Sequence, residues 1–571
     1  MSETQAPSET KERKNTISVV IHYLNRPIGH NESLLSQMGH TQKNVTLKVH
    51  DPHSLMVSGE ETAVEQFIAE QKTAESSPED LVVFYDHNHP KTVKNRFSPH
   101  FIKVDKPKTE SHFIKVDTLK IEEKRQEREE KDQAKERISQ SNNQPQALSQ
   151  ALKTAFTAAD IAKIYQLPSL TPKSTVSPKI GIISLGGNLS VSDCTAYWKA
   201  MGTSATKVTI KLVDQSTLPP SSDANLENLL DVQISGTLCP GATVNFYSAP
   251  NTDLGFKDAV YAAYKDKVNV ISISWGAPES SWETDRPLML ALNQTLQLAA
   301  SAGITTCVAS GDNGSGDGTY ALSVDFPASS PNVLAVGGTS LYATTTNQYS
   351  SETVWSWNTT QQWGTGGGLS QVFAQPSWQA AITYYGETTK PKVPTRFVPD
   401  VALNADPNTP WIVYMNGSAT YVGGTSCAAP AVAGAFANLH CNMFVAPLLY
   451  AAYTKLAKPS LASFVHLITV GNNASFGNGK YTASPTGGFS LCTGVGSLQG
   501  TTYNSILSPP TSTTAHVAPA VPAKPFVVPR LIAPQVASSV PPVSTVFNPL
   551  SSEVSPNKFC SLLCENGCCF W

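Results

Sequence analysis

Short apolar runs alternate with longer helical patterns between residues 179 and 336, and this alternation limits what the chain can fold into. The apolar runs predict strands at residues 179–185, 243–248, 268–275, 304–310 and 333–336. The stretches between them predict helices at residues 190–201, 225–237, 255–265 and 286–302. Strands separated by helices pair in parallel, because each helix carries the chain back across the sheet. We therefore predict an α/β fold, with a parallel sheet covered by helices on both faces.

The composition is that of a globular protein. The chain has 571 residues, more than one ordinary domain, of which 40% are hydrophobic and 15% charged. A formal net charge of −3 gives no reason to expect a nucleic-acid partner. No stretch of about eighteen apolar residues predicts a membrane span, and residues 1–16 lack the apolar core of a secretory signal.

Changes in composition divide the chain into six parts. Residues 1–16 are polar, and residues 17–115 contain strand-like runs and an amphipathic stretch. Residues 116–149 alternate in charge with few apolar residues, which predicts a solvated helix or an open linker. Residues 150–504 hold the alternating strands and helices. Residues 505–558 are a Pro-, Ser- and Thr-rich linker, and residues 559–571 are a Cys-rich tail.

Residues 423–430, Gly-Gly-Thr-Ser-Cys-Ala-Ala-Pro, predict an exposed nucleophile at Ser426. Two glycines let the backbone turn sharply, and Pro430 suits the first turn of a helix that we expect over residues 431–438. Ser426 would then lie where amide hydrogens and the helix dipole favour an oxyanion. A loop that only caps a buried helix could have the same sequence, so the assignment of a nucleophile needs support from other residues.

Carboxyl groups are the candidates for the base that a serine nucleophile needs. Between residues 150 and 504 the sequence contains the histidines His440 and His466, both after Ser426. Glu227 and Asp231 lie in an apolar stretch and are four residues apart, so on a helix they share one face. A solvated helical face is the alternative for this pair.

A third acid, Asp312, follows the apolar run 304–308 within the sequence Ser-Gly-Asp-Asn-Gly. Ligands gather at the carboxyl ends of strands in open α/β sheets, so Asp312 is placed for chemistry. An ordinary turn is the alternative, because Gly, Asn and Asp are common in turns.

Together these three segments resemble the sedolisins, the serine-carboxyl peptidases. Further motifs follow in the family's order at residues 156–161, 165–168, 180–185, 270–276, 325–331, 366–370 and 399–402. The resemblance implies a subtilisin-like sheet in a peptidase domain over roughly residues 150–504. It also implies that residues 17–115 are a smaller α+β propeptide domain, shortened in its middle.

The resemblance assigns four catalytic roles. It makes Ser426 the nucleophile, Glu227 the general base, Asp231 the partner that orients Glu227, and Asp312 the donor to the oxyanion. A carboxylate is a competent base in mild acid, and a carboxyl group donates a hydrogen bond only when protonated, so both roles favour acid conditions. The resemblance also implies that substrate is bound at Ser274, Trp275, Gly276 and Asp325.

The family's calcium site is the clearest departure. Family members commonly bind calcium near the carboxyl end of the catalytic domain, where this chain has Leu467 and Ser490 in place of two carboxylates. A hard cation that seeks oxygen is poorly served without them. We therefore expect no cofactor and predict that the domain folds without calcium.

We predict an acid-acting serine-carboxyl peptidase that cleaves polypeptides, as an endopeptidase or a tripeptidyl peptidase. The alternative is a catalytically idle homologue that serves as a binding or structural module, which the lost calcium ligands and the short propeptide suggest. Proteolytic activation is expected in the charged linker or just beyond it. The compartment is left open, with export by another route or delivery to an acidic compartment as the alternatives.

The tail carries the four cysteines Cys560, Cys564, Cys568 and Cys569. Two disulfides, a thiolate metal site, acylation and pairing with another molecule are the alternatives for them. We expect the tail to attach the chain to a partner.

Overall fold

The computed structural model describes most of the peptidase-like part of the chain and portions of the part before it. The described residues are 16–24, 45–74, 81–85, 97–106, 152–168, 177–203, 206–219, 224–283, 285–357, 363–386, 394–456, 458–474, 481–500 and 502. The polar N-terminus up to residue 15, the charged linker at 116–149 and the Cys-rich tail lie outside them.

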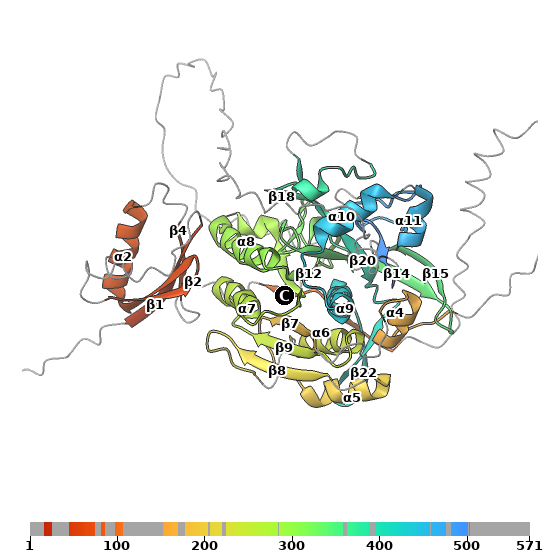
Figure 1. Cartoon of the computed structure of the whole chain (residues 1–571), viewed down its shortest axis with the longest axis horizontal. Coiled ribbons are helices and arrows are strands. Elements are labelled where there is room, and N and C mark those ends of the chain that lie inside the picture. Colours follow the sequence, from red (N-terminus) through yellow and green to blue (C-terminus); the bar gives the residue numbers. More distant parts are fainter. Residues whose placement is uncertain are drawn as a thin grey trace, which may run out of the picture. The chain divides into compact units, whose positions relative to one another are not determined.

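A mostly parallel sheet forms the centre of the peptidase-like part (Figure 1). Its strands lie in the order β23-β24-β20-β14-β12-β10-β7-β9-β8, with β15 paired to β14. All neighbours pair in parallel except β14 with β15 and β23 with β24. The strands are β7 (Lys179–Ser184), β8 (Lys207–Leu212), β9 (Thr243–Ser248), β10 (Val270–Ile273), β12 (Thr305–Ala309), β14 (Leu334–Ala343), β15 (Tyr349–Val354), β20 (Val401–Asn404), β23 (Val465–His466) and β24 (Ser497–Leu498).

Helices cover both faces of this sheet, as the alternating pattern predicts. Successive residues of one strand point to opposite faces, so Val270 packs in the core beneath α6 and α9 while Ile271 packs beneath α7 and α8. Each face therefore buries its own apolar layer. The helices are α4 (Ala158–Ile164), α5 (Val191–Met201), α6 (Ala224–Leu238), α7 (Asp253–Lys265), α8 (Arg286–Ser301), α9 (Thr425–Asn438), α10 (Ala446–Lys455) and α11 (Lys458–Phe464).

The start of α9 differs from the expected one. The helix begins at Thr425 rather than at residue 431, so Pro430 lies inside it. Proline has no amide hydrogen, and therefore the carbonyl of Ser426, four residues earlier, lacks its helical partner. The Ser274 hydroxyl faces that carbonyl at 3.5 Å. The local sequence did not reveal this early start, because the contacts that stabilise the first turn come from distant segments.

A smaller antiparallel sheet precedes the peptidase-like part. Its strands lie in the order β2-β3-β1-β4, with helix α2 packed against them. Their alternating inward residues, such as Val19, Ile21, Leu55 and Val57, meet Phe67 of the helix in one core. The elements are β1 (Thr16–Tyr23), β2 (Val45–Asp51), β3 (Ser54–Glu60), α2 (Glu61–Ala74) and β4 (Leu81–Tyr85).

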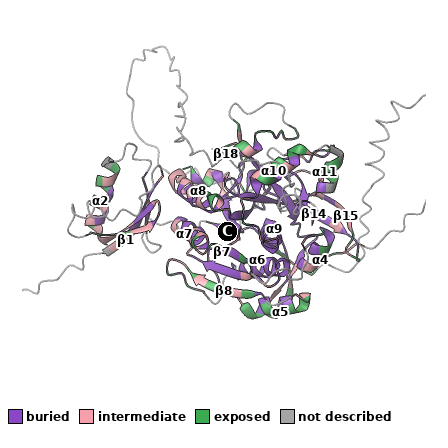
Figure 2. Ribbon diagram, viewed as in Figure 1, coloured by how far each residue is buried: buried purple, intermediate pink, exposed green. Residues whose placement is uncertain are grey.

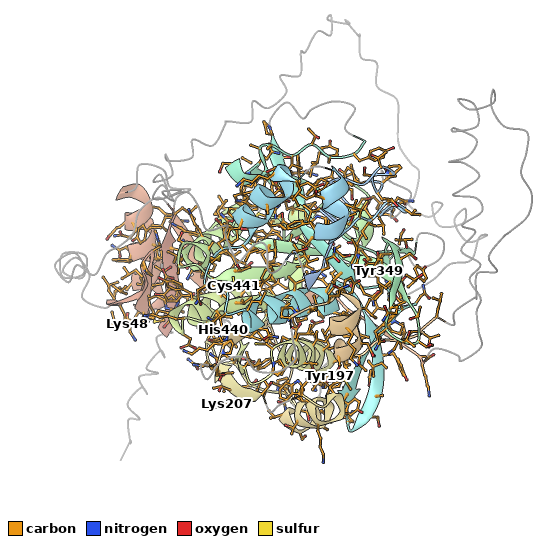
Figure 3. The ribbon with its side chains drawn as sticks, turned by 45° about the vertical axis from the view of Figure 1, so that its right-hand side comes forward. Lys48, Tyr197, Lys207, Tyr349, His440 and Cys441 are labelled. Carbon is orange, nitrogen blue, oxygen red and sulfur yellow. The ribbon has the colours of Figure 1, made fainter. Side chains whose placement is uncertain are left out.

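Burial is strongest in the sheet and in α9, all of whose residues are buried (Figure 2). Exposed residues lie on α5 and α10. Side chains fill the space between the sheet and its helices, among them Tyr197 of α5 and Cys441 just after α9 (Figure 3). Among the described residues, no helix is both long and apolar enough to cross a bilayer.

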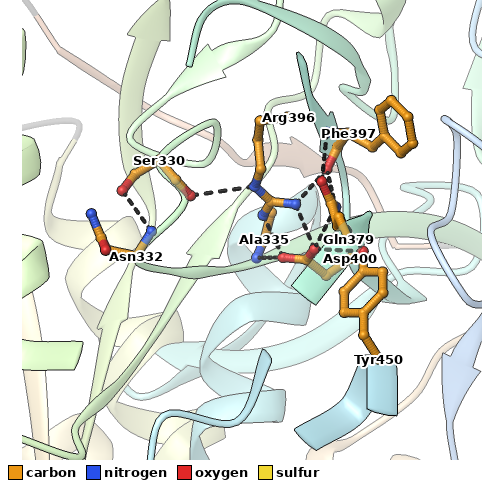
Figure 4. A network of polar contacts seen from close by, with 8 residues as sticks. All are labelled: Ser330, Asn332, Ala335, Gln379, Arg396, Phe397, Asp400 and Tyr450. Atoms are coloured by element: carbon orange, nitrogen blue, oxygen red, sulfur yellow. Dashed lines mark hydrogen bonds and ion pairs between the residues drawn. The ribbon is translucent and has the colours of Figure 1, made fainter. Parts of the chain in front are cut away.

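A buried ion pair joins Arg396 of β19 (Thr395–Val398) to Asp400, which lies just before β20 (Figure 4). Arg396 donates two hydrogen bonds of 2.6 Å to the carboxylate of Asp400, a bidentate arrangement. Asp400 also accepts from the amide of Ala335 in β14 and from the hydroxyl of Tyr450 in α10. These partners of Asp400 come from separate segments of the folded chain. We therefore interpret the network as stabilising the fold rather than as part of a reacting site.

Candidate active site

Two helices bring the candidate nucleophile and the two candidate carboxyls together. Ser426 is the second residue of α9, while Glu227 and Asp231 lie one turn apart on α6. Ser426 and Glu227 are 0% exposed and Asp231 is 1% exposed, so the pair is not a solvated helical face. The two helices pack closely, because a Cβ at Gly434 of α9 would lie only 2.7 Å from the carbonyl of Ser235 on α6.

Ser274, directly after β10, connects the two helices. Its hydroxyl donates to Asp231 Oδ1 at 2.7 Å, and its carbonyl accepts from Ser426 Oγ at 3.4 Å. Among the described residues, the Glu227 oxygens have no hydrogen-bond partner of ordinary length. The hydroxyls of Ser426 and Ser274 nevertheless lie close enough to favour the ionised form of Glu227. Such contacts are often long in a resting site.

Burial governs the protonation of the two α6 carboxyls. It raises the pKa of Glu227 well above its ordinary value, and the neighbouring Asp231 charge raises it further. Burial also raises the pKa of Asp231 well above its ordinary value, against the hydrogen bond from Ser274. Two close carboxyls out of water share protons, so they titrate as a pair and keep a proton to higher pH than free carboxyls.

Asp312 has one occupied and one free carboxyl oxygen. Its Oδ1 accepts from the amide and the hydroxyl of Thr425, both at 2.8 Å. Its Oδ2 is buried and, among the described residues, has no hydrogen-bond partner. Burial raises the pKa of Asp312 to about 7, although Thr425 favours the ionised form. In mild acid the group is therefore protonated and able to donate from the free oxygen.

Residues 97–106, from the part of the chain that we assigned to the propeptide, lie in the same site. The amide of Ser426 donates to the carbonyl of His100 at 2.9 Å, and the amide of His100 donates to the carbonyl of Ser274 at 3.1 Å. A Cβ at Gly424 would lie 2.3 Å from the His100 carbonyl oxygen and 2.5 Å from Asp312 Oδ2. A glycine is therefore needed here, since both oxygens converge beside its Cα.

An acidic pocket receives the His100 side chain. His100 Nε2 lies 3.3 Å from Asp325 Oδ2. Asp325 lies so close over Gly276 that a Cβ there would be 1.9 Å from its Oδ1. Burial raises the pKa of both Asp317 and Asp325 well above the ordinary value, and the two carboxyls interact with each other. At least one proton is therefore retained in the pocket in mild acid.

The other residues with expected roles are placed as follows. Ser274, Trp275 and Gly276 lie beside residues 98–100, and Asp325 lines the acidic pocket. His440 follows α9, and His466 stacks on Tyr349 in the far part of the sheet, so neither is placed as the base for Ser426.

The residues at the family's calcium position offer no carboxylate. The Ser490 hydroxyl is buried and lies 3.0 Å from the Thr493 hydroxyl, while the Leu467 side chain packs over Gly487. Two hydroxyl groups and an apolar side chain do not make a ligand set suited to a hard cation such as calcium. That calcium does not stabilise the chain stays a prediction.

Three residues with a part in this site were missed in the sequence. Thr425 precedes Ser426 in the Gly-Gly-Thr-Ser motif, and it positions Asp312 through two hydrogen bonds. Asp317 lies five residues after Asp312 in a Gly-rich loop, which was a usable signal. His100 gave none, because it lies more than 300 residues before Ser426 and outside every motif of the peptidase domain.

Comparison with known proteins bears on the family and the fold. The model of the subtilase family of peptidases matches residues 184–442. The solved structure of Pseudomonas sedolisin, a serine-carboxyl proteinase complexed with two molecules of pseudo-iodotyrostatin, is 30% identical with a TM-score of 0.54, and covers 60% of this chain and 95% of that one. The chain belongs to the sedolisin family. The subtilisin-like fold expected for that family is therefore confirmed.

Curated relatives in the sedolisin family are matched over part of their length. Kumamolisin from Bacillus sp. (strain MN-32) is 38% identical over 371 residues, which are 63% of this chain and 65% of kumamolisin. Sedolisin from Pseudomonas sp. (strain 101) is 33% identical over 340 residues, which are 56% of each chain. The match thus spans less than two thirds of either relative.

Proposed function

We propose that the protein is a serine-carboxyl peptidase that hydrolyses polypeptides in acid. One observation carries the proposal: Ser426 lies at the start of α9 beside two buried carboxyls of α6, while the free oxygen of Asp312 faces a peptide carbonyl bound to the Ser426 amide. The names of the relatives, among them a serine-carboxyl proteinase, support the same class of reaction.

The proposed mechanism uses these groups in turn. Ser426 Oγ attacks the carbonyl carbon of the substrate while Glu227, in its ionised form, accepts the hydroxyl proton. Asp231 holds Glu227 in place, and burial keeps a proton on the pair, although the hydrogen bond from Ser274 favours the ionised form of Asp231. The oxyanion receives hydrogen bonds from the Ser426 amide and from protonated Asp312. Glu227 then gives its proton to the leaving amine, and water releases the acyl group by the reverse steps.

The test is hydrolysis of an acid-denatured protein by the purified full chain between pH 3 and pH 7. We expect activity that Ser426→Ala and Glu227→Gln each reduce by at least about 1,000-fold, as for the loss of a nucleophile or its base. Ser418→Ala, at an exposed position of the nearby strand β22 (Ser418–Gly423), is the matched control and should retain full activity. Equal background rates for the unaltered chain and Ser426→Ala would instead favour the idle homologue.

A further inference from the structure

Residues 97–106 lie in the site as an extended strand that is held on both sides of Ser426. On the amino side, β5 (Ser98–Pro99) pairs antiparallel with β11 (Trp275–Pro278). On the carboxyl side, β6 (Ile102–Val104) pairs antiparallel with β22. A peptide that adds to sheet edges takes its affinity from the main chain and its specificity from the side chains that enter pockets. The strand therefore shows where the successive side chains of a bound peptide lie.

Burial along this strand marks the side chains that enter pockets. The carbonyl of His100 is the one held at the nucleophile, so the bond after it occupies the position of a scissile bond. Phe97, the fourth residue before that bond, is 2% exposed, and Ile102, the second residue after it, is 8% exposed. Their neighbours Ser98 and Lys103 are exposed. Two apolar positions, one on each side of the bond, are thus enclosed by the protein.

Phe97 is held through both its main chain and its ring. The side-chain amide of Asn251 accepts from the Phe97 amide at 3.0 Å and donates to the Phe97 carbonyl at 2.8 Å. The ring lies edge-on to Phe256 of α7, with ring centroids 4.9 Å apart, and its centroid is 5.5 Å from that of Trp282. Phe256 and Trp282 belong to the buried core, so the pocket keeps its shape. Such edge-on and tilted ring contacts favour an aromatic side chain.

Ile102 enters a second apolar pocket on the opposite side of the bond. It packs against Trp355, which is 0% exposed, with the partly buried Trp363 beside it. The amide of Gly364 donates to the carbonyl of Asp312 at 2.8 Å, which ties this pocket to the segment that carries the oxyanion donor. A branched aliphatic side chain at this position therefore fills a pocket of fixed place relative to the reacting groups.

We propose that the site selects polypeptides by two apolar side chains: an aromatic one at the fourth position before the scissile bond and a branched aliphatic one at the second position after it. This inference rests on the proposed function. The two positions are five residues apart, about 17 Å along an extended chain, so the substrate must continue on both sides of the bond.

The fourth position also distinguishes the two modes of cleavage left open by the sequence. A tripeptidyl peptidase releases three residues, and a substrate bound in that way would leave the Asn251 amide and the aromatic pocket without a ligand. A polar side chain that recognises the main chain of a fourth residue is of use only where the substrate extends beyond the third. The geometry therefore favours an endopeptidase.

Mapping of cleavage sites tests both positions at once. Acid-denatured protein is digested briefly by the purified full chain at pH 4, and the cut bonds are identified by mass spectrometry. We expect aromatic residues at the fourth position before the bond, and Ile, Val or Leu at the second after it, to be enriched about 3-fold or more over their frequency in the substrate. The third positions on either side, where the strand's side chains are exposed, are the internal controls and should show no apolar enrichment.

A series of synthetic peptides measures each position separately. The parent is Ala-Phe-Ser-Ala-Lys-Phe-Ile-Lys-Val-Ala, in which the bond between Lys and Phe is scissile. Ala in place of the first Phe or of Ile should each lower kcat/KM by about 10-fold, and so should a peptide shortened to begin at Ser. Ala in place of Ser or of the second Lys is the matched control and should leave kcat/KM within about 2-fold.

Asn251→Ala connects the effect to the pocket. It removes the hydrogen bonds to the main chain of the fourth residue, so kcat/KM should fall by about 10-fold for the parent peptide but by less than about 2-fold for the shortened one, which has no fourth residue. Equal losses on both peptides would overturn the role of Asn251.

The outcomes separate this inference from the proposed function. If denatured protein is hydrolysed, but the cut bonds show no preference and all peptides are cut at equal rates, the inference fails while the proposed function stands. If Ser426→Ala matches the unaltered chain on every substrate, both fail.

Discussion

At the scale of single residues, the fold decides which oxygen of Asp312 is free. Thr425 donates two hydrogen bonds to Oδ1, so the proton that burial retains resides on Oδ2, the oxygen that lies near the His100 carbonyl beside Gly424. Because the pKa of Asp312 is raised to about 7, the proton is present in mild acid and is lost as the pH rises through that value. Asp312 can therefore donate a hydrogen bond only at pH values below about 7.

This predicts different pH profiles for two substitutions of Asp312. Asp312→Ala removes the donor and should lower the rate by about 100-fold or more at pH 4. Asp312→Asn keeps an acceptor for Thr425 and places an NH₂ donor near Oδ2 at every pH, so it should retain more activity and lose the decline near pH 7 that Asp312 causes. Profiles of kcat/KM between pH 3 and pH 8 are the measurement. Identical profiles for Asp312→Asn and the unaltered enzyme would contradict the donor role.

At the scale of secondary structure, the distance between α6 and α9 sets the geometry of the site. Glu227 and Asp231 come from one helix and Ser426 from the other, so a small separation of the helices moves the base away from the nucleophile. Glycine at position 434 permits their close approach, since a Cβ there would lie 2.7 Å from the Ser235 carbonyl and 3.0 Å from Leu238 Cβ.

Gly434→Ala tests this role of the helix contact. Backbone atoms must shift to admit the methyl group, which should destabilise the fold by about 1–3 kcal/mol despite the higher helix propensity of alanine. Activity should fall by about 10-fold or more, because small displacements of reacting groups are costly. Thermal unfolding and kcat measured on the same preparation give both readouts. A variant with raised stability and full activity would show that the approach of α6 and α9 does not require a glycine at position 434.

At the scale of the whole molecule, buried carboxyls with raised pKa values dominate the pH dependence of stability. Glu227, Asp231, Asp312, Asp317 and Asp325 all belong to this group, and burial is the first cause for each. Between their unfolded and folded pKa values, such groups are protonated in the fold but ionised in the unfolded chain. Their contribution to stability is fully present below the unfolded pKa, near 4. That contribution is lost as the pH rises towards the folded value. The two carboxyl groups beside Lys257 act in the opposite direction. Burial alone would raise the pKa of Asp51 and of Asp258, but the charge of Lys257 outweighs it and lowers both values. Their contribution to stability is therefore lost in strong acid.

The folded chain should therefore lose stability between pH 4 and pH 7, the window given for Asp312 by its pKa of about 7. Each such group contributes a slope of about 1.4 kcal/mol per pH unit while its two states differ in protonation. Unfolding by denaturant is measured on Ser426→Ala, which avoids self-digestion. Adding Asp312→Asn to the Ser426→Ala protein should remove the contribution of Asp312 to the slope of unfolding free energy against pH. Stability that rises from pH 4 to pH 7 would contradict the raised pKa values.

The sequence by itself determined the layered α/β fold and the positions of its main elements. Strand β9 lies at the residues expected for it, and α5, α6, α7 and α8 agree with expectation within two residues at either end. Such elements follow from the local period of apolar residues, which short-range geometry imposes. The candidates Glu227, Asp231, Asp312 and Ser426 also came from local motifs and their resemblance to a family.

Only the tertiary structure decided what surrounds those candidates. The hold of Thr425 on Asp312 joins residues 113 positions apart, and the contact of His100 with Ser426 joins residues much farther apart. Strand β6 reaches β22 only because the sheet and α9 place that edge beside the nucleophile. Pairing between distant edges leaves no periodic mark on either segment, since backbone hydrogen bonds are much the same for most side chains. The candidate chemistry could thus be predicted from residue types, but the strand that crosses the site became visible only once the chain was folded.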